Sequence, residues 1–184
     1  IFPDNHDMDR IYTQLGEDYD LYRMAMVFLA TMRGIPQFFY GDEILMSHTG
    51  TSSHGALRMD MPGGWAGDER NAFESEGLSD DERRAQQFLR KLLNWRKSAT
   101  VIHTGKYMHF APIRDVFAYF RYDDKQTVMV VFNRSHETQT LDLERFSERL
   151  KDNAFGTDVI SGKRFNMKKP MLLAPRSALL LELQ

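Results

Sequence analysis

The sequence predicts an α/β region followed by an all-β region. Residues 1–100 alternate short apolar runs typical of strands with runs that repeat at helical spacing. Residues 101–184 instead contain many short β-prone runs separated by turn signals, which is typical of an antiparallel β-sandwich. We therefore expect two domains, residues 1–100 and 101–184, the first made of the last βα units of a parallel α/β fold.

The first region is predicted to form a helix and then a strand. Tyr19 to Met32 should be helical because its apolar residues recur at steps of three and four. These residues are Leu21, Met24, Ala25, Phe28, Leu29 and Met32. Gly34 and Pro36 end this helix, and Gln37–Tyr40 is predicted to be a short apolar strand.

A long loop and a second helix complete the first region. Residues 46–78 are rich in Gly, Ser, Thr and Asp, and loops of this length in compact domains are often functional. Ser79 and Glu82 have the spacing of a capping box, so a helix should begin at this point. Its predicted apolar face consists of Ala85, Phe88, Leu89, Leu92 and Trp95.

The second region is predicted to consist of strands around one short helix. Val116–Tyr122 and Thr127–Phe132 flank a turn and form the clearest hairpin. Leu143–Leu150 is expected to be the short helix. The remaining strands are expected at Lys106–Ala111, Thr138–Leu141, Thr157–Ile160, Pro170–Leu173 and Ser177–Leu183.

Composition excludes several functional classes. The 184 residues carry a formal net charge of -2 with basic and acidic residues interspersed, so we expect no nucleic-acid partner. No apolar stretch of the sequence approaches the roughly 18 residues of a membrane span, so no membrane span is predicted. The absence of Cys excludes disulfides and thiol chemistry. Because the sequence starts inside a motif, the lack of a signal peptide says nothing about export.

The candidate chemistry begins at Asn5-His6-Asp7, which follows a short apolar segment. Barrel folds place catalytic groups directly after strand ends, although a polar triplet alone is also typical of a turn. A second motif, Gly34 to Glu43, reads Gly-Ile-Pro-Gln-Phe-Phe-Tyr-Gly-Asp-Glu. In this order and at this separation, the two motifs together are much more specific than either alone.

These motifs resemble those of the α-amylase family of glycoside hydrolases. Phe2 to Asp7 resembles the family's late barrel strand that ends in Asn-His-Asp, and Gly34–Glu43 resembles its last barrel strand. Arg58–Trp65 resembles the loop after that strand in enzymes of the neopullulanase and cyclomaltodextrinase type. The resemblance implies that residues 1–100 are the C-terminal part of a catalytic TIM (β/α)8 barrel, and that residues 101–184 are the family's C-terminal antiparallel β-sandwich domain.

The resemblance assigns roles to three residues. Asp7 is implied to be the catalytic carboxylate that holds the sugar hydroxyls and stabilises the oxocarbenium-like transition state. His6 is implied to bind the same sugar, with a capping histidine as the alternative. Arg58 matches an arginine that contacts the next glucose unit, with a surface arginine as the alternative. That alternative stays open because Gly55-Ala56-Leu57 stands where many relatives have Asp-Pro.

Other polar and aromatic residues carry weaker signals. Asn5 is expected to brace the loop, Tyr40 to pack in the barrel, and Asp42 with Glu43 to hold the loop after the last strand. Trp65 has two readings, stacking on a sugar ring and packing within its loop. The histidines show no metal-ligand spacing, so no metal site is predicted, and no cofactor is required. Calcium in the parent enzyme is left open.

The catalytic set that the resemblance implies extends beyond these residues. The family cleaves α-glucosidic bonds with retention through an Asp nucleophile and a Glu general acid, and neither of their motifs occurs in this sequence. We therefore expect the chain alone to be inactive and the parent protein to act on α-glucans or maltooligosaccharides.

Several alternatives and properties stay open at this point. A transglycosylase or isomerase of the same family is one alternative. A non-catalytic glucan-binding module is another, with Tyr107, Phe117, Tyr119 and Tyr122 as a stacking platform. Alternation along the strand places Phe117 and Tyr119 on one face and Phe120 and Tyr122 on the other. The resemblance alone suggests a homodimeric parent and a periplasmic or extracellular bacterial location.

Overall fold

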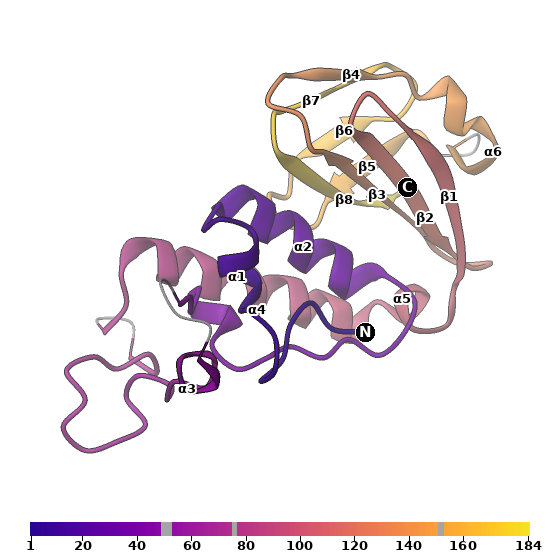
Figure 1. Ribbon diagram of the computed structural model, residues 1–184. Helices are drawn as coiled ribbons and strands as arrows, with labels where there is room; N and C mark the ends of the chain where they lie inside the picture. Colours follow the sequence, from indigo (N-terminus) through magenta and orange to yellow (C-terminus); the bar gives the residue numbers. More distant parts are fainter. Residues whose placement is uncertain (49–52, 75–76, 151–152) are drawn as a thin grey trace.

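The computed structural model describes residues 1–48, 53–74, 77–150 and 153–184, which form a helical layer and two β-sheets (Figure 1). The helical elements before the sheets are α1 (Ile11–Gln14), α2 (Tyr19–Thr31), the 3-10 turn η1 (Asp42–Ile44), α3 (His54–Leu57), α4 (Asp80–Ser98) and α5 (Thr100–Thr104). Within the described ranges, no helix combines the length and apolar character needed to cross a membrane.

Six strands form one antiparallel sheet and two strands form another. The larger sheet has the order β1-β2-β3-β8-β5-β6, and the smaller one pairs β4 with β7. The bounds are β1 Lys106–Ile113, β2 Val116–Tyr122, β3 Thr127–Asn133, β4 Gln139–Leu141, β5 Phe155–Asp158, β6 Arg164–Asn166, β7 Met171–Leu173 and β8 Ser177–Leu183. Between β4 and β5 lie the 3-10 turn η3 (Glu144–Phe146) and α6 (Ser147–Leu150).

The two long helices start where local capping chemistry predicts. The Asp18 side chain accepts a hydrogen bond from the Leu21 N–H and begins α2. The predicted capping box of α4 is confirmed, because Ser79 and Glu82 each accept a hydrogen bond from the other's backbone N–H. Both caps are formed by residues three positions apart, so the start of each helix is defined by local contacts.

Two hydrophobic cores lie on opposite faces of the six-stranded sheet. One face, with Tyr119 and Val130, packs against α2 and α4 through residues such as Met26 and Leu92. The other face packs against the two-stranded sheet, η3 and α6. Figure 1 shows the resulting order of layers, with the helices below the large sheet and β4 and β7 on its far side. The helices of the first region and the sheet of the second therefore share a core, and the predicted boundary at residue 100 stays a prediction.

The strand predicted at Gln37–Tyr40 is wrong for this chain, and the segment before Asp7 forms no strand either. Two hydrogen bonds of parallel type remain: the Ile1 amino group donates to the Ile35 carbonyl (2.8 Å), and the Gln37 N–H donates to the Ile1 carbonyl (2.9 Å). The two segments thus lie side by side and parallel, without the further ladder hydrogen bonds that would make them strands.

Smaller differences follow from turns and short elements. The strand predicted at Thr157–Ile160 lies two residues earlier as β5, because a turn at residues 159–162 is closed by the Asp158 carboxylate. Strand β6 and helices α1, α3 and α5 have no counterpart among the predictions. Helix α3 interrupts the predicted loop 46–78, of which residues 49–52 and 75–76 lie outside the described residues.

Candidate active site

Asp7 lies in a short turn that begins and ends at buried residues. We call residues Asp4–Arg10 the Asp7 loop, since Asp4 and Arg10 are fully buried while the Asp7 side chain is 57% exposed. The Asn5 side-chain oxygen accepts a hydrogen bond from the Asp7 N–H at 2.8 Å, and the Met8 N–H donates to the Asn5 carbonyl at 3.2 Å. This is the bracing contact expected of Asn5, and it presents the Asp7 carboxylate to solvent on a fixed turn.

The three predicted site residues lie together although they are far apart in sequence. Arg58 Nη2 donates to Asp7 Oδ1 at 2.7 Å across 51 residues, and Arg58 Nε donates to the His6 carbonyl at 3.1 Å. His6 Nε2 lies 3.0 Å from Asp7 Oδ2. Each carboxylate oxygen thus has a side-chain nitrogen within hydrogen-bond distance, Arg58 Nη2 at Oδ1 and His6 Nε2 at Oδ2, and the two contacts together orient the carboxylate.

His54 is a fourth member of this cluster that the sequence reasoning missed. Its Nδ1 lies 3.9 Å from Asp7 Oδ1 and 3.5 Å from Arg58 Nη2. His54 begins α3 and Arg58 follows the helix directly, so the two residues are four apart and share one face. The four-residue spacing of His54 and Arg58 could have indicated that they share a face only if a helix had been predicted there. The Gly- and Ser-rich composition of this loop did not predict α3.

Tyr40 anchors the loop that carries Arg58, and its predicted packing in the barrel stays a prediction. The residue is 41% exposed, and its hydroxyl donates to the Met59 carbonyl at 2.8 Å. Asp42 and Glu43 behave as expected of residues that hold the turn. Asp42 Oδ2 accepts the Phe39 N–H at 3.1 Å, and Glu43 Oε2 accepts the Gly41 N–H at 2.8 Å.

The acidic loop around Trp65 is braced by its own side chains. Asp68 Oδ2 accepts the backbone N–H groups of Gly63 (2.7 Å) and Trp65 (3.2 Å), and Asp60 Oδ2 accepts the indole N–H of Trp65 at 3.1 Å. The Trp65 ring remains 67% exposed, so stacking on a sugar stays a prediction. In the described part of the chain, no three acidic or histidine side chains converge as a metal site, and calcium in the parent protein stays open.

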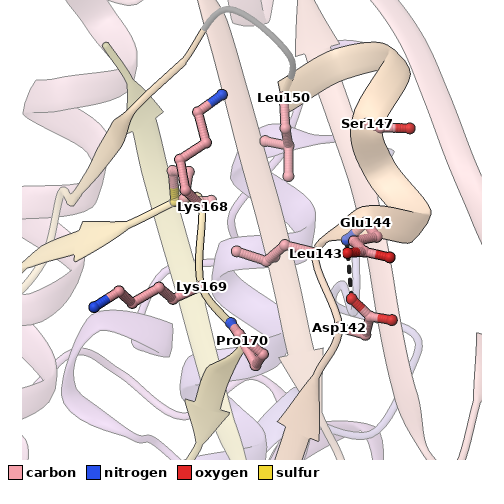
Figure 2. A pocket seen from close by; sticks show the side chains of 9 residues that line it. Asp142, Leu143, Glu144, Ser147, Leu150, Lys168, Lys169 and Pro170 are labelled. Atoms are coloured by element: carbon pink, nitrogen blue, oxygen red, sulfur yellow. Dashed lines mark hydrogen bonds between the residues drawn. The ribbon is translucent and has the colours of Figure 1, made fainter.

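A hollow in the C-terminal region carries no chemistry comparable to that of the Asp7 cluster. Figure 2 shows it between the segment Asp142–Leu150 and the segment Met167–Pro170, with a volume of about 240 Å³. Its Asp142 carboxylate accepts the Glu144 N–H at 3.0 Å, and Lys169 lies on the opposite wall. No histidine lines this hollow, and its charges do not converge on one point as those around Asp7 do.

The aromatic residues of the sheet do not form one exposed platform. Tyr119 is fully buried, and Tyr107 and Phe117 pack with it under the helical layer. Tyr122 packs against the core on the opposite face, together with Phe120. The predicted alternation of faces is confirmed, and the stacking platform expected of a glucan-binding module is wrong for these four residues.

Comparison with known protein families agrees with the motifs at the Asp7 loop. Residues 1–138 match the family described as the α-amylase catalytic domain, and residues 107–182 match the cyclomaltodextrinase C-terminal domain. The chain belongs to the α-amylase family. The first match covers the Asp7 loop, Arg58 and both long helices, while the second covers the two sheets.

Curated relatives within the α-amylase family include both hydrolases and transferases. A maltogenic α-amylase of Bacillus acidopullulyticus is 30% identical over 135 residues, which cover 71% of this chain and 20% of the relative. A cyclomaltodextrin glucanotransferase of Bacillus sp. (strain 38-2) is 31% identical over 137 residues, which cover 74% of this chain and 17% of the relative. The chain therefore spans about a fifth of the length of these relatives.

Solved structures of the family share the fold across the whole chain. AmyP E221Q in complex with maltotriose superposes with a TM-score of 0.80 at 18% identity, covering 100% of this chain and 40% of that one. The α-amylase of Geobacillus thermoleovorans in complex with acarbose gives a TM-score of 0.75 at 19% identity, covering 100% of this chain and 38% of that one. The last βα part of a barrel followed by an antiparallel β domain is thus confirmed as the fold.

Proposed function

We propose that the protein containing this chain is a retaining glycoside hydrolase that acts on α-glucans or maltooligosaccharides, and that Asp7 is one of its catalytic carboxylates. The observation that carries the proposal is the Asp7 carboxylate itself, which is held on a braced turn with a donor nitrogen facing each oxygen. The solved relatives with bound maltotriose and acarbose support an oligosaccharide substrate.

The chemistry follows from the charge that develops on the sugar ring. As the glycosidic bond breaks, the ring gains oxocarbenium character, and its hydroxyl groups become better hydrogen-bond donors. A carboxylate fixed in advance accepts those bonds more strongly in the transition state than in the ground state. In this proposal His6 supplies a further donor for the same sugar and Arg58 contacts substrate beside Asp7, which the contacts of both residues with Asp7 support.

The test is the Asp7→Asn variant of the full-length protein, assayed on maltooligosaccharide, pullulan and cyclodextrin. We expect kcat to fall by about 10²–10³-fold, the range found when one preorganised transition-state contact is removed. Asp9→Asn is the matched control, since Asp9 lies in the same loop but faces His48. Near-normal turnover by Asp7→Asn would refute the proposed role.

The isolated 184-residue chain supplies a second test. The Asp nucleophile and Glu acid implied by the family have no counterpart motif in this sequence, so we expect no turnover by the purified chain on the same three substrates. Substantial turnover by the chain alone would show that another carboxylate pair in it performs the chemistry.

A transglycosylase is the second candidate, favoured by the cyclomaltodextrin glucanotransferases among the relatives. Both activities share the steps up to the covalent intermediate and differ in whether water or a sugar accepts the glycosyl group. Product analysis at high maltooligosaccharide concentration separates them. Longer or cyclic products as the main fraction would favour transfer, and shorter products alone would favour hydrolysis.

A further inference from the structure

The Asp7 loop is anchored at both ends by buried charged residues. Asp4 lies three residues before Asp7 and Arg10 three residues after it, and both side chains are fully buried. Asp4 Oδ2 accepts the Ile11 N–H at 2.7 Å, which ties the start of the loop to the beginning of α1. The exposed carboxylate of Asp7 is thus carried by a turn whose two ends cannot move independently.

Arg10 joins this loop to the turn that follows the second motif. Its Nη1 donates to the Tyr40 carbonyl, and its guanidinium carbon lies 4.3 Å from the Phe39 ring centroid and 4.8 Å from that of Tyr40. Buried cations over aromatic faces are held more tightly than exposed ones. Since Tyr40 also bonds the segment that carries Arg58, one residue connects both sides of the Asp7 cluster.

Asp42 completes the buried cluster on the side of that turn. Its side chain is 2% exposed and contacts Asp4 directly, and its backbone carbonyl accepts the Tyr22 hydroxyl of α2 at 2.8 Å. Each of the two carboxyl groups has one oxygen without a donor among the described residues. A proton held between Asp42 and Asp4 supplies the missing donor and leaves the pair with one negative charge, which the positive charge of Arg10 stabilises.

The directions of the pKa shifts agree with this arrangement. Burial raises the pKa of both carboxyl groups, and the negative charge of Asp4 raises the pKa of Asp42 further, to about 8. The positive charge of Arg10 lowers both pKa values, and so does one backbone N–H for each group, that of Ile11 for Asp4 and that of Phe39 for Asp42. The two buried carboxyl groups therefore share one proton, and the pair keeps one negative charge.

We propose that Asp4, Arg10 and Asp42 form a buried clamp that fixes the Asp7 loop against the turn at residues 39–42, so that Asp4 and Arg10 are positioning residues for Asp7. The inference rests on the proposed function, because positioning Asp7 affects catalysis only if Asp7 is a catalytic carboxylate. Displacing a reacting group by about 1 Å is enough to cost about 10²-fold in rate. The clamp connects the position of Asp7 to two segments that are separated by thirty residues of chain.

The test is a double-mutant cycle in the full-length protein, with Asp4→Ala combined with Asp7→Asn. Asp4→Ala should lower kcat by about 10–100-fold with little change in KM, since the loop loses its hold on the reacting group. In the Asp7→Asn background the same substitution should lower kcat less than about 3-fold, because its effect acts through Asp7. Asp4→Asn keeps an oxygen for the Ile11 N–H, so its kcat should be about tenfold higher than that of Asp4→Ala. The same variant keeps the proposal testable if Asp4→Ala does not fold.

The matched control is Asp158→Ala, another buried carboxylate that holds a turn through backbone N–H groups. Asp158 accepts bonds from Ser161 and Leu180 in the C-terminal region. This variant should lose stability while kcat per folded molecule is retained. Equal effects of Asp4→Ala in both backgrounds, or an unchanged kcat per folded molecule, would overturn the clamp alone. Full activity of Asp7→Asn would instead overturn the proposed function and the clamp with it.

Discussion

Replacing Asp42 by Asn should change how the stability of this protein depends on pH. Asp42 is buried beside Asp4, and its pKa is raised from 3.8 to about 8. In the unfolded chain the carboxyl group titrates near its ordinary value, so between these two values the native state holds a proton that the unfolded state releases. The native protein therefore loses stability as pH rises through this window, and above the folded-state pKa the loss is complete.

The magnitude follows from the linkage between proton binding and folding. Each pH unit between the two pKa values lowers the free energy of unfolding by about 1.4 kcal/mol for one group. From about pH 6 to about pH 8, the wild type should lose about 2–3 kcal/mol through Asp42. Asn keeps the shape of the protonated acid, an oxygen for the Phe39 N–H and a donor toward Asp4, but it cannot ionise.

The assay is urea denaturation of the wild type and Asp42→Asn, followed by circular dichroism across that pH range. We expect the variant to lie within about 1 kcal/mol of the wild type near pH 6 and to be more stable by about 2–3 kcal/mol near pH 8. Glu43→Gln is the control, since it removes a neighbouring carboxylate that contacts backbone only and should leave the slope unchanged. Parallel pH profiles of the wild type and Asp42→Asn would refute the raised pKa and the shared proton.

Two further predictions concern groups that hold the helices. Ser79→Ala removes half of the capping box of α4 and should cost about 1 kcal/mol of stability, measured by thermal or chemical unfolding. Arg121→Met removes a buried guanidinium that donates to the carbonyls of Thr31 (2.9 Å) and Gly105 (3.0 Å), and leaving these acceptors unpaired should cost about 2–4 kcal/mol. Arg90→Met on the exposed face of α4 is its control, and an equal loss in both Arg variants would contradict the role given to Arg121.

Elements with local causes were predictable from the sequence. The capping box at Ser79 and the hairpin of β2 and β3 depend on residues within a few positions of each other, and the structure confirms both. The apolar run Gln37–Tyr40 has the composition of a strand but gets its hydrogen bonds from neighbouring chain segments. Among the described residues, Ile1 supplies the one strand-type partner of this run, through the Gln37 N–H, so the local pattern predicted an element that the described structure does not form.

The candidate site likewise contains residues that the sequence predicted and residues that depend on tertiary packing. The residue types of the Asp7 motif predicted which groups matter, and the structure brings Asp7, His6 and Arg58 together. Neither His54 nor the buried clamp was predicted. His54 lies 47 residues after Asp7 in the sequence, and Tyr40 lies 30 residues after Arg10. No local propensity encodes such pairs, because each depends on how the intervening helix α2 packs.

The clamp gives a physical reason why the two motifs are specific only together. The first motif provides Asp4, the residues directly after it provide Arg10, and the second motif provides the turn at Gly41 and Asp42 that receives them. Gly41 has a positive φ of 90°, and a Cβ there would lie 2.9 Å from Arg10 Nη1 and 2.3 Å from the Met46 sulfur. A side chain at this position would push the guanidinium off the turn and loosen the loop that carries Asp7. Gly41 of the second motif and Arg10, which follows the first motif, are therefore two halves of one contact that joins the two segments.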